Sequence, residues 1–335
     1  YYTWEILDND WASVGVRQIG AVAGEDVDIS ASRTCPFGTP YHLSFFGPGS
    51  VDFVAVNGFR DAERFHQARA FSDGTGGTVL SPYIIESRFF ASVANVGATL
   101  TDTFTANDVL DNFRTPVVAG KVYAAQVINN TAAADLDLFR FASTRVDGRR
   151  GVNDGSSAVA TPGADETIVF TAAATGTDGF TVTNETGVTA AYTFKVWLRP
   201  LVTAIPNLTT CFGLPFTRTP TLVEGSTPVT WTKIAGPAAL SVNPATGQIT
   251  WANPAPAGNY VVTVRATNPA GFDEESFTLT VGCRADVNCD GEATFDDIQA
   301  FVGLYNASNP RADFNNDGEW TFDDIQLFVS LYNAC

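Results

Sequence analysis

The sequence predicts a mainly β protein, in which serial β-sandwich domains are followed by a small α-helical module. Only 16% of the 335 residues are charged, whereas 29 are Gly and 17 are Pro, and this composition suits secreted all-β modules. Short runs that alternate between polar and apolar residues, separated by Gly and Pro clusters, predict strands over residues 1–283. From residue 284 onward the apolar period lengthens to that of a helix.

Residues 1–105 are predicted to form an N-terminal β-sandwich. A helical pattern occurs in this region only over residues 61–71. Runs rich in β-branched and aromatic residues give the strand candidates, which are residues 14–19, 27–30, 51–56 and 89–93.

The first eight residues resemble an extended strand with one aromatic face. Tyr2, Trp4 and Ile6 fall on the same side of residues 1–8. Two interpretations stay open: the segment is the first strand of its own sandwich, or it is a donor strand that completes an exposed sheet edge of a neighbouring subunit.

Residues 106–200 contain an ordered series of strand patterns, which cover residues 117–127, 134–141, 166–170, 180–182 and 192–197. That order resembles the bacterial pre-peptidase C-terminal domain, a β-sandwich appended to secreted enzymes and surface proteins. Asp135 and Asp137 occupy alternate positions of one strand. We interpret them as solvated surface charge, with contact to an ion as the alternative.

A short linker over residues 199–206 precedes a further β-sandwich, residues 207–283. The turn Asn243-Pro-Ala-Thr-Gly-Gln-Ile, the later Ala257-Gly-Asn-Tyr and the alternating strand after it resemble the immunoglobulin-like modules of bacterial surface proteins. The resemblance implies a spacer fold without chemistry of its own.

Residues 284–335 contain one motif twice, 27 positions apart, since Asp286 returns as Asp313. The segment DVNCDGEATFDD ends at Asp297, and its copy DFNNDGEWTFDD ends at Asp324. This is the spacing of a calcium loop, in which alternate residues turn oxygens inward, a Gly permits a sharp bend and a carboxylate at the start of a helix closes the shell. The candidate metal ligands are Asp286, Asn288, Asp290, Glu292, Thr294, Asp297, Asp313, Asn315, Asp317, Glu319, Thr321 and Asp324.

The two loops predict two calcium ions. Glu292 and Glu319 would contribute backbone carbonyls, and Thr294 and Thr321 would act through water. Three carboxylates converge in each loop and would repel one another without a cation, so we expect the ions to be part of the fold. A short helix should follow each loop, with apolar stripes at Ile298, Phe301, Val302 and Tyr305, and at Ile325, Phe328, Val329 and Tyr332.

A strand-like run ends at Gly282-Cys283, so no helix can enter the first loop. Loop plus exiting helix in duplicate resembles the type I dockerin module, a shortened EF-hand type, over residues 284–335. The resemblance implies two calcium ions, an extracytoplasmic setting and a cohesin partner. Dockerins usually carry small hydroxyl residues just before the closing Asp, where this chain has Phe295-Asp296 and Phe322-Asp323, and the helices here lack Lys and Arg.

The five cysteines lie near predicted domain edges. We expect Cys211 to pair with Cys283 and Cys289 with Cys335, which would leave Cys35 as a buried free thiol. Spacing alone leaves other pairings open.

No catalytic arrangement is recognisable, and we expect a protein that is not an enzyme. His42 and His66 form no metal-binding pattern with Cys35. The net charge of -17 argues against nucleic acid and anionic membrane surfaces, and no apolar run reaches the roughly 18 residues of a membrane helix. The absence of an initial Met suggests a precursor whose signal peptide has been removed.

Three functional hypotheses follow. The leading one is a non-catalytic, secreted, calcium-binding structural protein of the cell surface or of an extracellular fibre, which self-associates head-to-tail into a linear polymer. The second is a dockerin-type scaffold-docking or carbohydrate-binding accessory protein, with a cohesin-like or polysaccharide partner. The third is the C-terminal tail of a secreted hydrolase.

Overall fold

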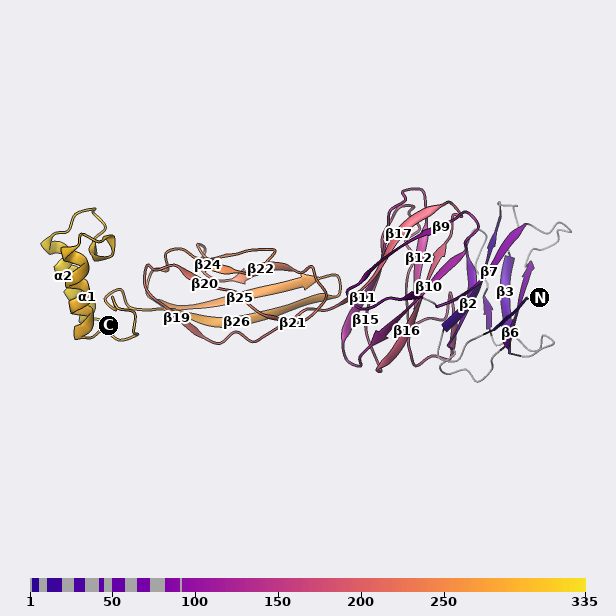
Figure 1. Cartoon of the computed structure of the whole chain (residues 1–335), viewed down its shortest axis with the longest axis horizontal. Coiled ribbons are helices and arrows are strands. Elements are labelled where there is room, and N and C mark those ends of the chain that lie inside the picture. Colours follow the sequence, from indigo (N-terminus) through magenta and orange to yellow (C-terminus); the bar gives the residue numbers. More distant parts are fainter. Residues whose placement is uncertain are drawn as a thin grey trace. The chain divides into compact units, whose positions relative to one another are not determined.

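The computed structural model describes residues 2–5, 11–19, 27–33, 42–44, 50–57, 65–72, 82–90 and 92–335. The chain forms two compact units, Tyr1–Arg199 and Pro200–Cys335. Antiparallel sheets make up most of both units, and two short helices follow at the C-terminal end (Figure 1). The predicted fold class is therefore confirmed.

The first unit contains four sheets, here called A to D, and each is given in its strand order. Sheet A consists of β1 (Tyr2–Glu5), β6 (Phe65–Ser72), β3 (Val27–Ser32) and β4 (His42–Ser44). Sheet B consists of β13 (Asp147–Arg149), β5 (Asp52–Asn57), β2 (Trp11–Gln18) and β7 (Tyr83–Phe89). Sheet C consists of β14 (Gly155–Ser157), β12 (Leu136–Phe141), β16 (Gly176–Asn184), β10 (Leu110–Val117) and β8 (Ser92–Val93). Sheet D consists of β15 (Glu166–Thr171), β11 (Val122–Asn129), β17 (Ala190–Leu198) and β9 (Thr99–Phe104).

The four sheets are layered in alphabetical order, with one hydrophobic core between each neighbouring pair. Strand β2 shows why, because it is buried on both faces. Its Val14 and Val16 pack toward sheet A, and its Trp11 packs toward sheet C. A strand that is buried on both sides must sit inside a stack rather than at its surface.

The core between sheets B and C is aromatic. Trp11 packs against Phe90 and Phe141, with ring centroids 5.7 and 5.8 Å apart. Gly15 lies at the closest approach of the two sheets, because a Cβ atom there would come within 2.5 Å of Leu110 Cδ2. This core joins the two sandwiches, A with B and C with D, into one unit.

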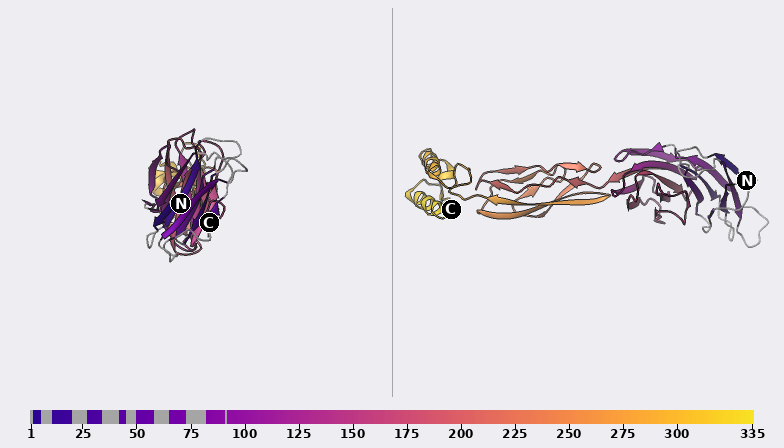
Figure 2. Two further views of the ribbon diagram at one scale, coloured as in Figure 1. Left: turned by 90° about the vertical axis from the view of Figure 1, so that its right-hand side faces the viewer. Right: turned by 90° about the horizontal axis from the view of Figure 1, so that it is seen from below.

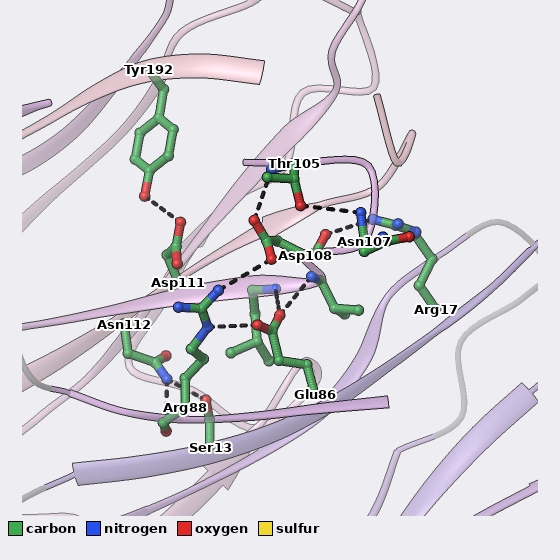
Figure 3. A network of polar contacts seen from close by, with 12 residues as sticks. Ser13, Arg17, Glu86, Arg88, Thr105, Asn107, Asp108, Asp111, Asn112 and Tyr192 are labelled. Atoms are coloured by element: carbon green, nitrogen blue, oxygen red, sulfur yellow. Dashed lines mark hydrogen bonds and ion pairs between the residues drawn. The ribbon is translucent and has the colours of Figure 1, made fainter. Parts of the chain in front are cut away.

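A polar network next to this core also joins sheets B and C (Figure 3). The Arg17 guanidinium donates to the carbonyls of Ala106, Asp108 and Asn184 at 2.6 to 2.9 Å. Nearby, Asp111 of sheet C accepts a hydrogen bond of 2.8 Å from Tyr192 Oη of sheet D. Burial raises the pKa of Asp111 to about 6, against the lowering effect of the Tyr192 hydrogen bond.

The domain boundary predicted at residue 105 does not separate the sheets, because strands from each side of it pair with strands from the other side. Strand β9 precedes that boundary and pairs with β17 of sheet D. Strand β13 lies far beyond it and pairs with β5 of sheet B. Such exchanges depend on contacts distant in sequence, so local patterns do not reveal them.

Two local predictions in this unit are wrong. Residues 65–71, expected to be helical, belong to strand β6, which pairs with β1 and β3; tertiary pairing overrides a weak helical pattern. Residues 117–127 do not form one strand, because a turn with Gly120 at φ +78° separates β10 from β11. Strand β1 pairs with β6 of its own chain, and residues 1 and 6–8 of the suggested donor segment lie outside the described residues.

The second unit begins with a β-sandwich, whose two layers face each other in Figure 2. One sheet contains β19 (Leu208–Thr210), β26 (Gly271–Val281), β25 (Gly258–Asn268) and β22 (Thr230–Ala235). The other contains β20 (Phe216–Arg218), β24 (Ile249–Trp251) and β23 (Ser241–Val242), and a further pair is β18 (Leu201–Val202) with β21 (Leu222–Glu224). The expected linker is thus part of the sandwich, since Val202 and Ile205 are buried in its core.

The C-terminal module contains α1 (Phe295–Asn306), the 3₁₀ helix η1 (Pro310–Ala312) and α2 (Phe322–Tyr332). Its core is built around Phe301 and Phe328, whose rings stack at 4.1 Å, and Phe314 meets both edge-on. The predicted helices are confirmed, but Val302 and Val329 are about half exposed and do not belong to the buried stripe. Within the described residues, no helix is long and apolar enough to cross a membrane.

Candidate metal centre

The first loop runs from the end of β26 to the start of α1 and gathers three acidic side chains. Carboxylate oxygens of Asp286, Asp290 and Asp297 all lie within 4.8 Å of one another. Asp286 and Asp297 are buried, whereas Asp290 is exposed. Convergent carboxylates are the ligand set of a hard cation, so this triad could bind a metal ion.

Backbone amides hold the first loop in its curved shape. The Asp286 carboxylate accepts from the amides of Asp290 at 3.1 Å and Gly291 at 3.0 Å. Gly291 has φ +97° and open space around its Cα, so it supplies the sharp bend that the sequence predicts. The Asn288 side chain donates to Asp290 at 2.8 Å and accepts from the Asp290 amide at 2.9 Å.

The second loop repeats these bonds residue for residue. The Asp313 carboxylate accepts from the amides of Asp317 at 3.2 Å and Gly318 at 2.9 Å. The Asn315 side chain donates to Asp317 at 2.7 Å. The two segments thus share one hydrogen-bond pattern, because the spacing of Asx and Gly residues determines it. Among the described residues, however, only the loop 1 carboxylates lie within 4.8 Å of one another.

The closing carboxylates lie at the starts of the helices and cap them. Asp297 accepts from the amides of Asn288 and Thr294, both at 2.9 Å. Asp324 accepts from the amides of Phe314, Asn315 and Thr321 at 2.7 to 3.2 Å. Burial would raise the pKa of Asp324, but these backbone hydrogen bonds outweigh it and lower the pKa.

The remaining predicted ligands also lie in the loops. The exposed Glu292 and Glu319 donate their backbone amides to the preceding Asp side chains at 3.0 and 2.8 Å. Thr321 Oγ1 is buried and has no hydrogen-bond partner within the described residues. A buried hydroxyl of this kind calls for a further polar partner, so the residues present fit a loop that holds a cation and water.

Two arginines bind the loops, and the motif did not include them. Arg284 donates to the carbonyls of Phe314 at 2.7 Å and Asp313 at 2.8 Å. Arg311 donates to the carbonyl of Val287 at 2.7 Å. The sequence repeat does contain these two arginines, because Arg284-Ala-Asp and Arg311-Ala-Asp extend it two residues upstream of each loop.

The expected cysteine pairing is wrong. The described residues contain the disulfides Cys211–Cys289 and Cys283–Cys335, with Cα atoms 5.6 and 6.0 Å apart. Strands β19 and β26 are parallel, so Cys211 and Cys283 both leave the sandwich toward the helical module. There loop 1 brings Cys289 to Cys211, and the end of α2 brings Cys335 to Cys283. Cys35 lies outside the described residues.

The other candidate residues lie in the first unit. Asp137 is buried and not solvated as expected, because Arg150 forms ion pairs with both Asp137 and Glu185. Burial, reinforced by Glu185, raises the pKa of Asp137 to about 7, against the lowering effect of Arg150. The positive charge that faces these two carboxylates is therefore supplied by the Arg150 guanidinium. His42 and His66 lie in β4 and β6, and their side chains are outside the described part.

A comparison with protein families identifies part of the second unit. The family model described as Putative Ig domain (He_PIG) matches residues 200–282. This span covers the sandwich from β18 to β26, so these residues form an Ig-like domain. No curated protein matches the sequence significantly.

Solved structures with similar folds include three bacterial proteins. A putative alpha-galactosidase from Bacteroides fragilis is 24% identical over 25% of this chain, with a TM-score of 0.23, and the match spans only 17% of that protein. The pre-peptidase C-terminal domain of a collagenase from Bacillus anthracis is 10% identical over 31% of this chain and 92% of that domain, with a TM-score of 0.26. A SusE-like surface-located polysaccharide-binding protein from Bacteroides thetaiotaomicron is 12% identical over 78% of this chain and 49% of its own, with a TM-score of 0.24. At these scores the likenesses assign no function.

Proposed function

We propose that the C-terminal module is a dockerin-like module that binds two calcium ions, and that the protein is a non-catalytic structural protein outside the cell. The observation that carries this proposal is the matching hydrogen-bond pattern of the two loops, from Asp286 and Asp313 at the entry to Asp297 and Asp324 at the close. All predicted ligands offer oxygen. Loops of mixed carboxylate, amide and carbonyl oxygens suit Ca²⁺, whereas Mg²⁺ prefers few protein ligands and retains water.

Disulfides support the extracellular setting. Both bonds lie in the second unit, at the junction of the Ig-like domain and the helical module. Such bonds persist in oxidising environments and are rare in the cytosol. Together with the successive β-sandwiches, they favour a spacer or fibre role over catalysis.

Calorimetry tests the calcium sites. Chelator-treated protein titrated with CaCl₂ should release heat and gain helical circular dichroism, with a stoichiometry of two ions per chain. MgCl₂ at the same concentration should bind much more weakly. A flat calcium titration with unchanged circular dichroism would contradict the proposal.

Head-to-tail self-association is the second part of the proposal. Strand β1 is an edge strand of sheet A, so exchange of residues 1–8 between copies would give an open, heterologous contact. Sedimentation velocity should detect oligomers of the full chain, and removal of residues 1–8 should abolish them while the monomer remains folded. Persistent oligomers in the shortened chain would rule out strand donation.

A docking role is the second candidate, because each helix exposes a large apolar side chain at its start. Phe295 is 64% exposed and Phe322, its repeat partner, is 65% exposed. Each Phe is followed by an exposed acidic residue, Asp296 or Asp323. This chemistry suits a protein partner with an apolar groove and basic flanks. Pull-down with a cohesin panel should fail after the double change Phe295→Ala and Phe322→Ala, while binding to a polysaccharide panel would instead indicate a carbohydrate-binding role.

A further inference from the structure

We propose that Arg284 and Arg311 are positioning residues that couple the two ion sites, so that an ion in either loop raises the affinity of the other. This inference rests on the proposed calcium function. It goes beyond it because it predicts cooperativity and names the residues that carry it.

Each arginine belongs to one loop and binds the other. Arg284 lies two residues before Asp286, yet its guanidinium holds the carbonyls of Asp313 and Phe314 at the entry of loop 2. Arg311 lies two residues before Asp313 and holds the carbonyl of Val287 at the entry of loop 1. The contacts are thus reciprocal, since Val287 and Phe314 are equivalent positions of the repeat.

The reciprocity gives a physical route for coupling. An ion that fixes Asp286 also restricts the adjoining backbone of Arg284, and through its two hydrogen bonds it orders the segment that presents Asp313. The second ion then binds a loop that has already lost part of its conformational freedom, which is favourable cooperativity without a large structural change. By linkage, the effect on the two affinities must be equal in both directions.

Arg284 should carry the larger share. Its guanidinium lies 5.4 Å from the ring centroid of Phe212 and 4.5 Å from that of Phe314, and the residue is half-buried. Arg311 is exposed and makes one hydrogen bond to loop 1. A packed side chain with three hydrogen bonds to loop 2, the third of them to Asn316 Oδ1 at 3.4 Å, transmits order better than an exposed one with a single bond.

Charge alone would act in the opposite direction. A guanidinium close to a loop repels an incoming cation and lowers affinity. The substitutions Arg284→Lys and Arg311→Lys keep the charge but lose the planar fork that can bind two acceptors. They therefore separate the positioning effect from the electrostatic one, whereas Arg284→Gln removes both.

The test compares stepwise binding constants from calcium titrations of the full chain. Asp324→Asn and Asp297→Asn each leave one working loop and so give the two intrinsic affinities. In the unchanged protein, the constant for binding both ions should exceed the product of these affinities about 5- to 20-fold. Arg284→Lys should reduce this coupling factor to between about 1 and 2, Arg311→Lys should reduce it less, and Arg265→Lys on the Ig-like sheet serves as the unaffected control.

The outcomes separate the two proposals. A coupling factor near one in the unchanged protein, with both ions bound, would overturn the inference and leave the calcium function intact. An undiminished factor in both Lys variants would show that other contacts carry the coupling, and would also overturn it. Failure to bind calcium at all would instead reject the proposed function. Circular dichroism of each calcium-loaded variant checks that it is folded.

Discussion

The two loops of the C-terminal module have the same ligand spacing but are held in different ways. At their fourth positions loop 1 has Cys289, with φ +66°, and loop 2 has Asn316, with φ +54°. Asn tolerates this left-handed conformation because its short polar side chain forms local hydrogen bonds. Cys has no such preference, and at this position it is joined to Cys211 beside β19 of the Ig-like domain.

The difference shows that one binding geometry can be stabilised covalently or locally. Loop 1 is cross-linked to a rigid β-sheet, whereas loop 2 receives the Arg284 hydrogen bonds and an intrinsically suitable residue. We therefore expect loop 1 to depend on its disulfide and loop 2 to depend on Asn316.

Loss of either closing carboxylate should have the largest effect. We predict that Asp297→Asn and Asp324→Asn each weaken calcium binding in their own loop by about 100-fold or more, because the substitution removes a charge from the ligand shell. Calorimetry should find one remaining strong site in each variant. The adjacent exposed residues give matched controls, since Asp296→Asn and Asp323→Asn should change affinity less than about 3-fold.

Removal of the loop 1 cross-link should have an intermediate effect. The double change Cys211→Ser with Cys289→Asn gives loop 1 the fourth residue of loop 2 and leaves Cys283–Cys335 intact. We predict that the affinity of loop 1 falls about 3- to 10-fold, because the freed loop loses more entropy on binding. If the calcium affinity of loop 2 fell equally, the effect of the Cys211–Cys289 disulfide would not be specific to loop 1.

The two units should respond to pH in opposite directions. The pKa of Asp111 is raised to about 6 mainly by burial, so the folded state of the first unit holds this proton more tightly than the unfolded state. This contribution to stability is complete below the unfolded pKa of about 4 and is lost as the pH rises through about 6, with a total on the order of 3 kcal/mol. The pKa of Asp324 is lowered instead, so its contribution is present above about pH 4 and is lost as the pH falls through the lowered folded value.

Thermal melts that follow the first unit between pH 4 and 7 test the predicted direction of its pH dependence. The melting temperature should fall as the pH rises, and Asp111→Asn should weaken the dependence, with a remainder from Asp137, whose pKa is raised to about 7. A melting temperature that rises over this range in the unchanged protein, and not in Asp111→Asn, would contradict the assignment.

Substitution of Asn316 should have the smallest effect. We predict that Asn316→Ala lowers calcium affinity in loop 2 about 2- to 5-fold, since φ +54° costs an alanine about 1 kcal/mol. Asn316→Gly should lose less affinity than Asn316→Ala, because Gly adopts this conformation freely and loses only the 3.4 Å hydrogen bond from Arg284. Equal losses in both variants would show that the Asn side chain acts by some means other than backbone conformation.

Local features of the C-terminal module were predictable from the sequence, whereas features that depend on contacts distant in sequence were not. The loops and helices follow from spacing within twelve residues, because Asx, Gly and apolar positions there determine the geometry. The disulfides and the aromatic core around Trp11 depend on which distant strands become neighbours, and a strand such as β13 joins a sheet formed mainly by residues of another region. Arg284 and Arg311 could have been predicted, because the sequence repeat contains them. They were missed because the calcium-loop motif begins at the first ligand, two residues later.

Native mass spectrometry of the chelator-treated chain, with CaCl₂ added stepwise, counts the bound calcium ions directly. We expect a final species that carries two calcium ions, a single ion in Asp297→Asn and in Asp324→Asn, and two again in Asp296→Asn. A chain that stays free of calcium throughout, or that still takes up two ions after either closing carboxylate is replaced, would contradict this expectation.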